Sequence, residues 1–164
     1  MNGMKKLLVA TGCSDYSRGL FRYSINLARS MEAEIIVASI INSRDVDAVS
    51  RISSLGYEVD GEHYVEGVRQ EREKYISRLL QEENAIPDKV RMVILVGNPI
   101  DELLTLSVKE KVDMIVMGIK GRTDLAKFFV GSVAEKVFRR SPVPVLSFRD
   151  EKSEARLRKR IPSH

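Results

Sequence analysis

The chain has 164 residues, of which 43% are apolar and 30% are charged, and it carries a single cysteine. This length and composition predict one domain with a buried core, and a single cysteine excludes an internal disulfide. No apolar run is long enough to cross a membrane, and the run near the N-terminus is too short for a signal peptide. We therefore expect a cytoplasmic protein with no membrane segment.

The net charge of +4 raises the question of nucleic-acid binding. Most of this excess lies between Arg149 and His164, which contains six Lys or Arg and three Asp or Glu residues. The rest of the chain shows no basic face interleaved with aromatic residues, so the sequence argues against a nucleic-acid partner. We predict a domain over residues 1–148, followed by a charged tail over residues 149–164.

Hydrophobic periodicity predicts a βαβ unit at the start of the chain. Its strands are Lys5–Thr11 and Glu34–Ile41, and its helix runs from Asp15 to Met31. Ser14 and Asp15 are good N-cap residues for this helix. Between residues 42 and 67 three glycines interrupt the periodicity, and no element is predicted there.

Helices and strands continue to alternate along the rest of the chain. The strands are apolar nearly throughout, which is typical of a parallel sheet with helices on both faces, so the fold class is α/β. The predicted elements are a helix over 68–84, a strand over Val90–Val96, a helix over Ile100–Lys109, a strand over Val112–Met117, a helix over Ser132–Arg140 and a strand over Val143–Phe148.

The most distinctive motif follows the strand that ends at Met117. Gly118, Gly121, Gly131 and Ser132 form the pattern G-x2-G-x9-G-S, between that strand and a predicted helix. Glycines let backbone amides approach a phosphate, and a helix N-terminus attracts anions. The pattern is neither a Walker A loop nor a dinucleotide fingerprint. It predicts a phosphate-binding loop; the alternative is a loop that needs positive φ angles and a serine cap.

On these residues the chain resembles the nucleotide-binding branch of the universal stress protein family, which has G-x2-G-x9-G-S/T after its fourth strand. The resemblance covers residues 4–148. It implies an open five-stranded parallel sheet of order 3-2-1-4-5, a dimer, and ATP, ADP or AMP in the cleft. Family members share no single catalytic activity and act in stress survival as nucleotide-dependent switches or partners. Further matches are LLVATGCSD, AEIIVASI, the turn Val96–Pro99, VDMIVMG and SPVPVL.

The resemblance also implies roles for individual residues. The four motif residues would hold the phosphates, and Val133 would assist through its backbone. Lys120 and Arg122 lie in the same loop, where each either reaches the phosphates or remains solvated, as loop charges usually do. Mg²⁺ would arrive with ATP, held mainly by phosphates.

For the other half of the nucleotide, the resemblance places Met117 and Gly118 along the ribose. Ala10, Thr11 and Ile40 would frame the adenine. Gly12 departs from the family pattern, which has an acidic residue at this position. We therefore expect altered affinity or nucleotide preference, which a comparison with a Gly12→Asp variant addresses.

No catalytic constellation is visible in the sequence. His63 and His164 lack neighbours that would make a metal site. Cys13 is expected to be an inert thiol, and the alternative is a redox role. The hypothesis we favour is an adenine-nucleotide-binding stress protein with an unknown protein partner. The alternatives are a weak ATPase or phosphotransfer protein that uses the same cleft, and a scaffold dimer without nucleotide.

Two prolines, Pro142 and Pro144, open the last predicted strand, which suits a strand at a sheet edge. An exposed apolar edge needs a partner or a cover. We expect a homodimer through Val143–Phe148; the alternative is an edge covered by the tail.

Overall fold

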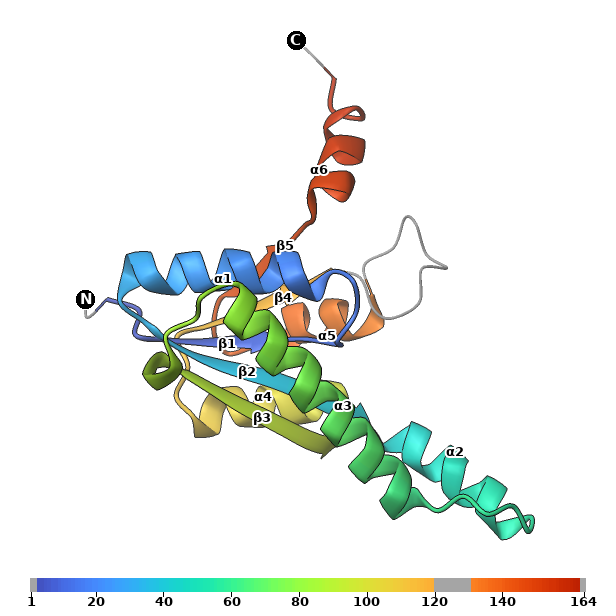
Figure 1. The fold of residues 1–164 in the computed structure, drawn as a ribbon. Coiled ribbons are helices and arrows are strands. Elements are labelled where there is room, and N and C mark those ends of the chain that lie inside the picture. Colours follow the sequence, from blue (N-terminus) through green and yellow to red (C-terminus); the bar gives the residue numbers. More distant parts are fainter. Residues whose placement is uncertain (1–2, 120–130, 163–164) are drawn as a thin grey trace.

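A five-stranded parallel sheet lies between two layers of helices in the computed structural model, which describes residues 3–119 and 131–162 (Figure 1). The strand order is β3-β2-β1-β4-β5, and every neighbouring pair is parallel. The predicted fold class and strand order are confirmed. The strands are β1 (Lys6–Ala10), β2 (Glu34–Asn42), β3 (Val90–Gly97), β4 (Met114–Gly118) and β5 (Val145–Phe148).

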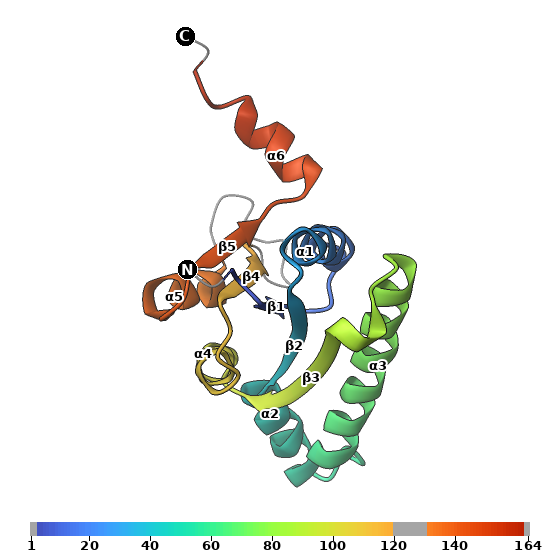
Figure 2. The ribbon, with the colours of Figure 1, turned by 90° about the vertical axis from the view of Figure 1, so that its left-hand side faces the viewer.

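Helices cover both faces of this sheet (Figure 2). Helices α1 and α3 pack on one face, and α4 and α5 pack on the other. Within the described ranges, no helix combines the length and the apolar character that a membrane span requires. The helices are α1 (Ser17–Met31), α2 (Ser43–Ser54), α3 (Gly61–Glu82), the short 3-10 helix η1 (Pro87–Lys89), α4 (Pro99–Lys109), α5 (Ser132–Arg140) and α6 (Glu151–Arg158).

Strand β1 contributes to both hydrophobic cores, because successive side chains of a strand point to opposite faces. Leu7 and Val9 pack with α1 and α3, whereas Leu8 and Ala10 pack with α4 and α5. Leu7, Leu8 and Val9 are completely buried. Each buried side chain of this size stabilises the fold by about 1.5–3 kcal/mol relative to an exposed one. Burial on both faces explains why the strands are apolar throughout.

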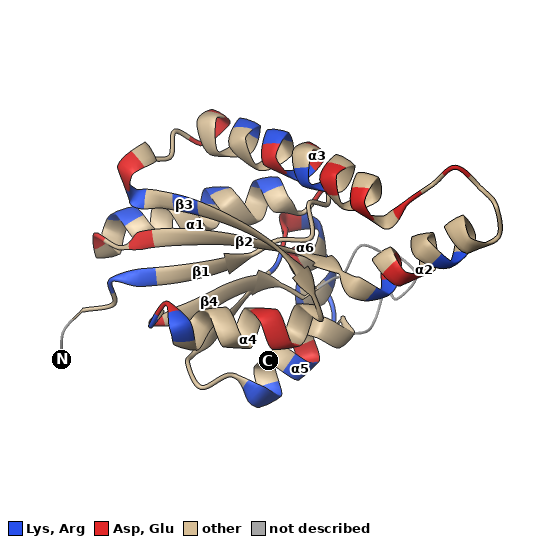
Figure 3. Ribbon diagram, turned by 90° about the horizontal axis from the view of Figure 1, so that it is seen from below, with Lys and Arg blue, Asp and Glu red and all other residues tan. Residues whose placement is uncertain are grey.

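The predicted gap between residues 42 and 67 is wrong, because helix α2 fills much of it and helix α3 begins at Gly61. Side chains cap both helices: the Asn42 side chain accepts from the Arg44 amide at 3.1 Å, and that of Asp60 accepts from the His63 amide at 2.7 Å. A glycine inside a helix costs only about 1 kcal/mol, so Gly67 does not end α3. Together α2 and the start of α3 project beyond the sheet (Figures 1 and 3).

The start of the first helix also differs from the prediction. Helix α1 begins at Ser17, and its N-cap residue Tyr16 makes no side-chain capping bond. Ser14 and Asp15, the predicted caps, lie in the preceding turn. The Ser17 hydroxyl oxygen accepts from the Ser14 amide at 3.1 Å, so the chain makes a turn before it enters the helix.

The segment after residue 148 contains a helix that the sequence analysis did not predict. Helix α6 extends away from the sheet (Figures 1 and 2). The Asp150 side chain accepts from the Ser153 amide at 2.9 Å and caps this helix. The domain boundary after residue 148 stays a prediction.

A pKa measurement tests the start of α3. The Asp60 carboxylate is 2.5 Å from Nδ1 of the exposed His63. This hydrogen bond and the negative charge of Asp60 raise the pKa of His63. Hydrogen bonds from the backbone amide and the ring of His63 lower the pKa of Asp60. An Asp60→Asn substitution keeps a helix cap but removes the charge, so the pKa of His63 should fall towards its ordinary value. Titration of the His63 ring protons by NMR measures this change.

The same shifts predict the pH range in which the pair stabilises the fold. Its contribution is lost as the pH rises through the raised pKa of His63, and it is also lost as the pH falls through the lowered pKa of Asp60. An equal His63 pKa in the wild type and in Asp60→Asn would contradict this arrangement.

Candidate functional site

The candidate site lies at the carboxyl edge of β1 and β4, the two central strands at which the strand order reverses. In the sheet register, Ala10 is paired with Met117 on one side and with Ala38 on the other. Ala10 and Met117 are buried in the core on the α4 and α5 face, and Ile40 packs against that core. The structure therefore brings together three of the residues predicted to contact the base and ribose.

The start of α5 is attached to the end of β4. The Gly131 amide donates to the carbonyl oxygen of Ile119 at 2.7 Å, and Ile119 directly follows Gly118, the last residue of β4. Val133 packs against the same core as Ala10 and Met117. The first turn of a helix has amide groups without a helical partner and a positive dipole end. The structure thus places an anion-attracting helix start beside Gly118.

The backbone angles of Gly118 and Gly131, the two motif glycines among the described residues, do not require glycine. Gly131 has φ −56° and ψ 145°, which any residue adopts, and the φ of Gly118 is not positive. A Cβ atom built on Gly118 meets no heavy atom within 4 Å among the described residues. A need for positive φ therefore does not explain these two glycines. Close approach of a ligand is a physical reason that remains for Gly118.

The alternative interpretation of the glycine motif expects a serine cap on α5, and the structure has a different N-cap residue. Gly131 is the N-cap, no side chain caps the helix, and Ser132 is its exposed first residue. Ser132 therefore lies in the first turn, where backbone amides have no partner within the helix. Gly121 and Arg122, with Lys120, lie outside the described residues.

The turn between β1 and α1 forms the opposite side of the edge. Thr11 is only 7% exposed, and its hydroxyl is 2.8 Å from the Ser17 hydroxyl and accepts from the Cys13 amide at 3.1 Å. The Thr11 side chain is thus committed to the turn, whereas Gly12 is exposed. Cys13 is half-buried and has a left-handed φ of 55°.

Sequence reasoning missed Arg72, which is 5% exposed and donates to the hydroxyl of the buried Ser39 at 3.0 Å. Ser39 lies in β2 beside this turn, and its hydroxyl donates to the Thr11 carbonyl oxygen at 3.0 Å. Arg72 precedes Ile76 by four residues and Leu79 by seven, which is the spacing of one helix face. A charged residue on the inner face of a helix was the signal that could have identified it.

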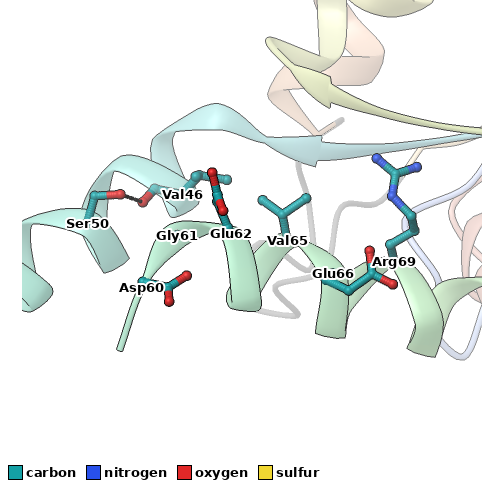
Figure 4. A pocket seen from close by; sticks show the side chains of 8 residues that line it. All are labelled: Val46, Ser50, Asp60, Gly61, Glu62, Val65, Glu66 and Arg69. Atoms are coloured by element: carbon teal, nitrogen blue, oxygen red, sulfur yellow. Dashed lines mark hydrogen bonds between the residues drawn. The ribbon is translucent and has the colours of Figure 1, made fainter. Parts of the chain in front are cut away.

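A separate pocket of about 650 Å³ lies between α2 and the start of α3 (Figure 4). Arg69 lies at one end of the pocket, and its guanidinium donates to the Ile94 carbonyl oxygen of β3 at 2.8 Å. None of the residues predicted to bind nucleotide lines it. The lining residues are Val46, Ser50, Asp60, Gly61, Glu62, Val65, Glu66 and Arg69.

Sequence comparisons connect this chain to known proteins. A model of the universal stress protein family matches residues 3–149. The chain is 29% identical over 153 residues to universal stress protein MJ0531 of Methanocaldococcus jannaschii, covering 93% of this chain and 86% of that protein. It is 30% identical over 148 residues to universal stress protein YxiE of Bacillus subtilis, covering 88% of this chain and 98% of that protein.

Solved structures share the fold. The structure of MJ0577 from Methanocaldococcus jannaschii is 25% identical and has a TM-score of 0.73, covering 90% of this chain and 97% of that chain. A universal stress protein in complex with cAMP has a TM-score of 0.58 at 23% identity, covering 90% and 98%. One from Archaeoglobus fulgidus in complex with dAMP has a TM-score of 0.55 at 20% identity, covering 91% and 100%. At these identities the last two show likeness of fold alone.

A stability measurement tests whether the fold needs glycine at position 118. We expect Gly118→Ala to change the free energy of unfolding by less than about 1 kcal/mol, because its Cβ atom meets no heavy atom of the described residues within 4 Å. Ile115→Ala, in the same strand but fully buried, is the matched comparison and should lose about 2–5 kcal/mol. Urea unfolding measures both, and a large loss at position 118 would show that the fold itself requires this glycine.

Proposed function

The chain belongs to the universal stress protein family, and we propose that it binds an adenine nucleotide, ATP or AMP, at the carboxyl edge of β1 and β4. The observation that carries the proposal is the pair formed by Gly118 and the start of α5, joined by the Gly131–Ile119 hydrogen bond. Neither glycine has a positive φ, so access for a phosphate is what these positions offer.

The two halves of the nucleotide have different requirements, and the edge offers a different surface to each. Gly118, Gly131 and Ser132 would hold the phosphates through backbone amides and the serine hydroxyl, with Gly121 and Arg122 contributing from the intervening segment. The triphosphate would bring Mg²⁺ with it. Open amides and the positive end of the α5 dipole favour such an anion.

The base and ribose would lie against apolar residues. Ala10 and Ile40 flank the proposed adenine position, and Met117 lies along the ribose. Pockets for small molecules are commonly lined by apolar side chains with a few polar groups that fix orientation. The complexes with cAMP and dAMP add that proteins of this fold accommodate an adenine nucleotide. Under this proposal the protein is cytoplasmic and binds a partner protein in the stress response in a nucleotide-dependent way.

Nucleotide binding has a direct test. Purified protein is denatured, its supernatant is analysed by anion exchange, and ATP and AMP are then titrated into the emptied, refolded protein. We expect copurified nucleotide in the wild type and at least about tenfold weaker ATP binding in Gly118→Ala, because its methyl group occupies space needed by the ligand. Gly67→Ala, on the exposed face of α3, is the control and should bind normally.

The outcomes separate the proposal from its rivals. An empty pocket with no thermal shift at millimolar ATP would overturn nucleotide binding and favour a scaffold. Conversion of ATP to ADP in the presence of Mg²⁺ would instead assign a weak ATPase to the same cleft. Equal ATP binding by Gly118→Ala and Gly67→Ala would show that the phosphates do not bind at Gly118.

A homodimer through the last strand is part of the proposal. Strand β5 lies at the sheet edge, pairs with β4 on one side, and has four half-buried residues. We expect a dimer in sedimentation velocity at micromolar concentration, and Leu146→Lys should shift it towards monomer, because a charge disfavours an apolar interface. Leu146 also packs against the core beneath α1, so circular dichroism must show that this variant is folded. Val108→Lys, at an exposed position on α4, is the control. A wild-type protein that is only monomeric would contradict the dimer.

A further inference from the structure

We infer that helix α3 sets the shape of the turn between β1 and α1, and that Arg72 and Tyr75 are positioning residues for the base and ribose half of the site. This inference rests on the proposed nucleotide-binding function. Neither side chain needs to touch the nucleotide; both act on the backbone of residues 11–14.

A row of three polar side chains on α3 carries the inference. Arg69 donates to the Ile94 carbonyl of β3 at 2.8 Å, and Arg72 donates to the Ser39 hydroxyl of β2 at 3.0 Å. The Tyr75 hydroxyl donates to the carbonyl oxygen of Ser14, in the turn after β1, at 2.8 Å. A spacing of three residues keeps side chains on one side of a helix. One helix face thereby makes hydrogen bonds to β3, to β2 and to the turn that follows β1.

The turn is held at two points by this row. At its start, the Ser39 hydroxyl connects Arg72 to the Thr11 carbonyl oxygen, with 3.0 Å for each hydrogen bond. At its end, Tyr75 binds the Ser14 carbonyl oxygen. The two residues between these points are Gly12 and Cys13, and Cys13 has a left-handed φ of 55°. A residue with a side chain holds this conformation only where its surroundings fix it.

The burial of Arg72 agrees with a positioning role. Arg72 is 5% exposed and Ser39 is completely buried. Removing a guanidinium from water is unfavourable, so an apolar side chain would satisfy packing at this position more easily. Arginine here supplies what an apolar residue cannot, which is a directional donor to the hydroxyl that binds Thr11.

The glycine at position 12 makes the backbone conformation of this turn important for binding. Because Gly12 has no side chain, the turn can offer a ligand at this position only backbone groups. The direction of those groups is set by the turn, and the turn is bound to α3. In a chain with a side chain at this position, a rotamer change could compensate for a shifted backbone; here it cannot.

Tyr75→Phe is the sharpest test, because it removes one hydroxyl and keeps the ring, which packs against the guanidinium of Arg78 at 5.4 Å. Tyr64→Phe, on the same helix, is the matched control. Cys13 is the only cysteine, so its alkylation by iodoacetamide reports the turn directly. We expect alkylation of Tyr75→Phe, without nucleotide, to be about fivefold faster than wild type, as loss of one net hydrogen bond implies. Arg72→Lys, which retains a charged donor, should show a smaller effect.

Ligand titrations distinguish positioning from a general loss of structure. Adenosine, AMP and ATP should each bind Tyr75→Phe about fivefold more weakly, because they share the base and ribose. Gly118→Ala should instead weaken ATP more than adenosine. Unchanged Cys13 alkylation in Tyr75→Phe, or equal changes in Tyr64→Phe, would overturn the inference. If the wild type bound no nucleotide, the proposed function would fail, while faster alkylation confined to Tyr75→Phe would still support control of the turn by α3.

Discussion

Strand β1 is paired along both of its edges, with β2 on one side and with β4 on the other, and its central residues are completely buried. This position constrains the rest of the molecule. Strands β2 and β3, which follow β1 in the chain, lie on one side of it, whereas the later strands β4 and β5 lie on the other side. The order of the strands therefore reverses between β1 and β4. Helices α1 and α3 cover one face of the sheet, and α4 and α5 cover the opposite face. A site at its carboxyl end follows from topology before any side chain is considered.

Polar groups at that end are arranged in a layer behind the candidate site. Thr11, Ser17 and Ser39 are nearly or completely buried, and hydrogen bonds connect Thr11 to each of the other two. Buried polar groups are tolerated when they are satisfied, and a satisfied network favours one local conformation over others. The apolar cluster of Ala10, Met117 and Val133 lies on the other side of the strand. The edge thus has packed apolar residues on one face of β1 and a hydrogen-bonded polar layer on the other.

The sequence was sufficient for the sheet, because buried parallel strands have continuous apolar runs that a short window detects. It failed between residues 42 and 67, where glycines were given more weight than the capping residues Asn42 and Asp60. The same limit applies to the site. The glycine motif follows from residue spacing and the strand ends follow from the predicted topology, whereas Arg72 depends on a contact with a strand far away in sequence. The position of Arg72 on the inner face of α3 is visible in the sequence, but its hydrogen-bond partner in β2 is not.

The position of β5 has a consequence for local stability. Amides in β1 are held between two strands, so their exchange with solvent requires the centre of the sheet to open. Strand β5 has four residues and one partner strand, so its end can separate while the centre remains intact. The two halves of the candidate site therefore differ in mechanical support. Within one protomer, the half attached to β1 lies in the doubly paired centre of the sheet, and the half attached to β4 is one strand from a short edge strand.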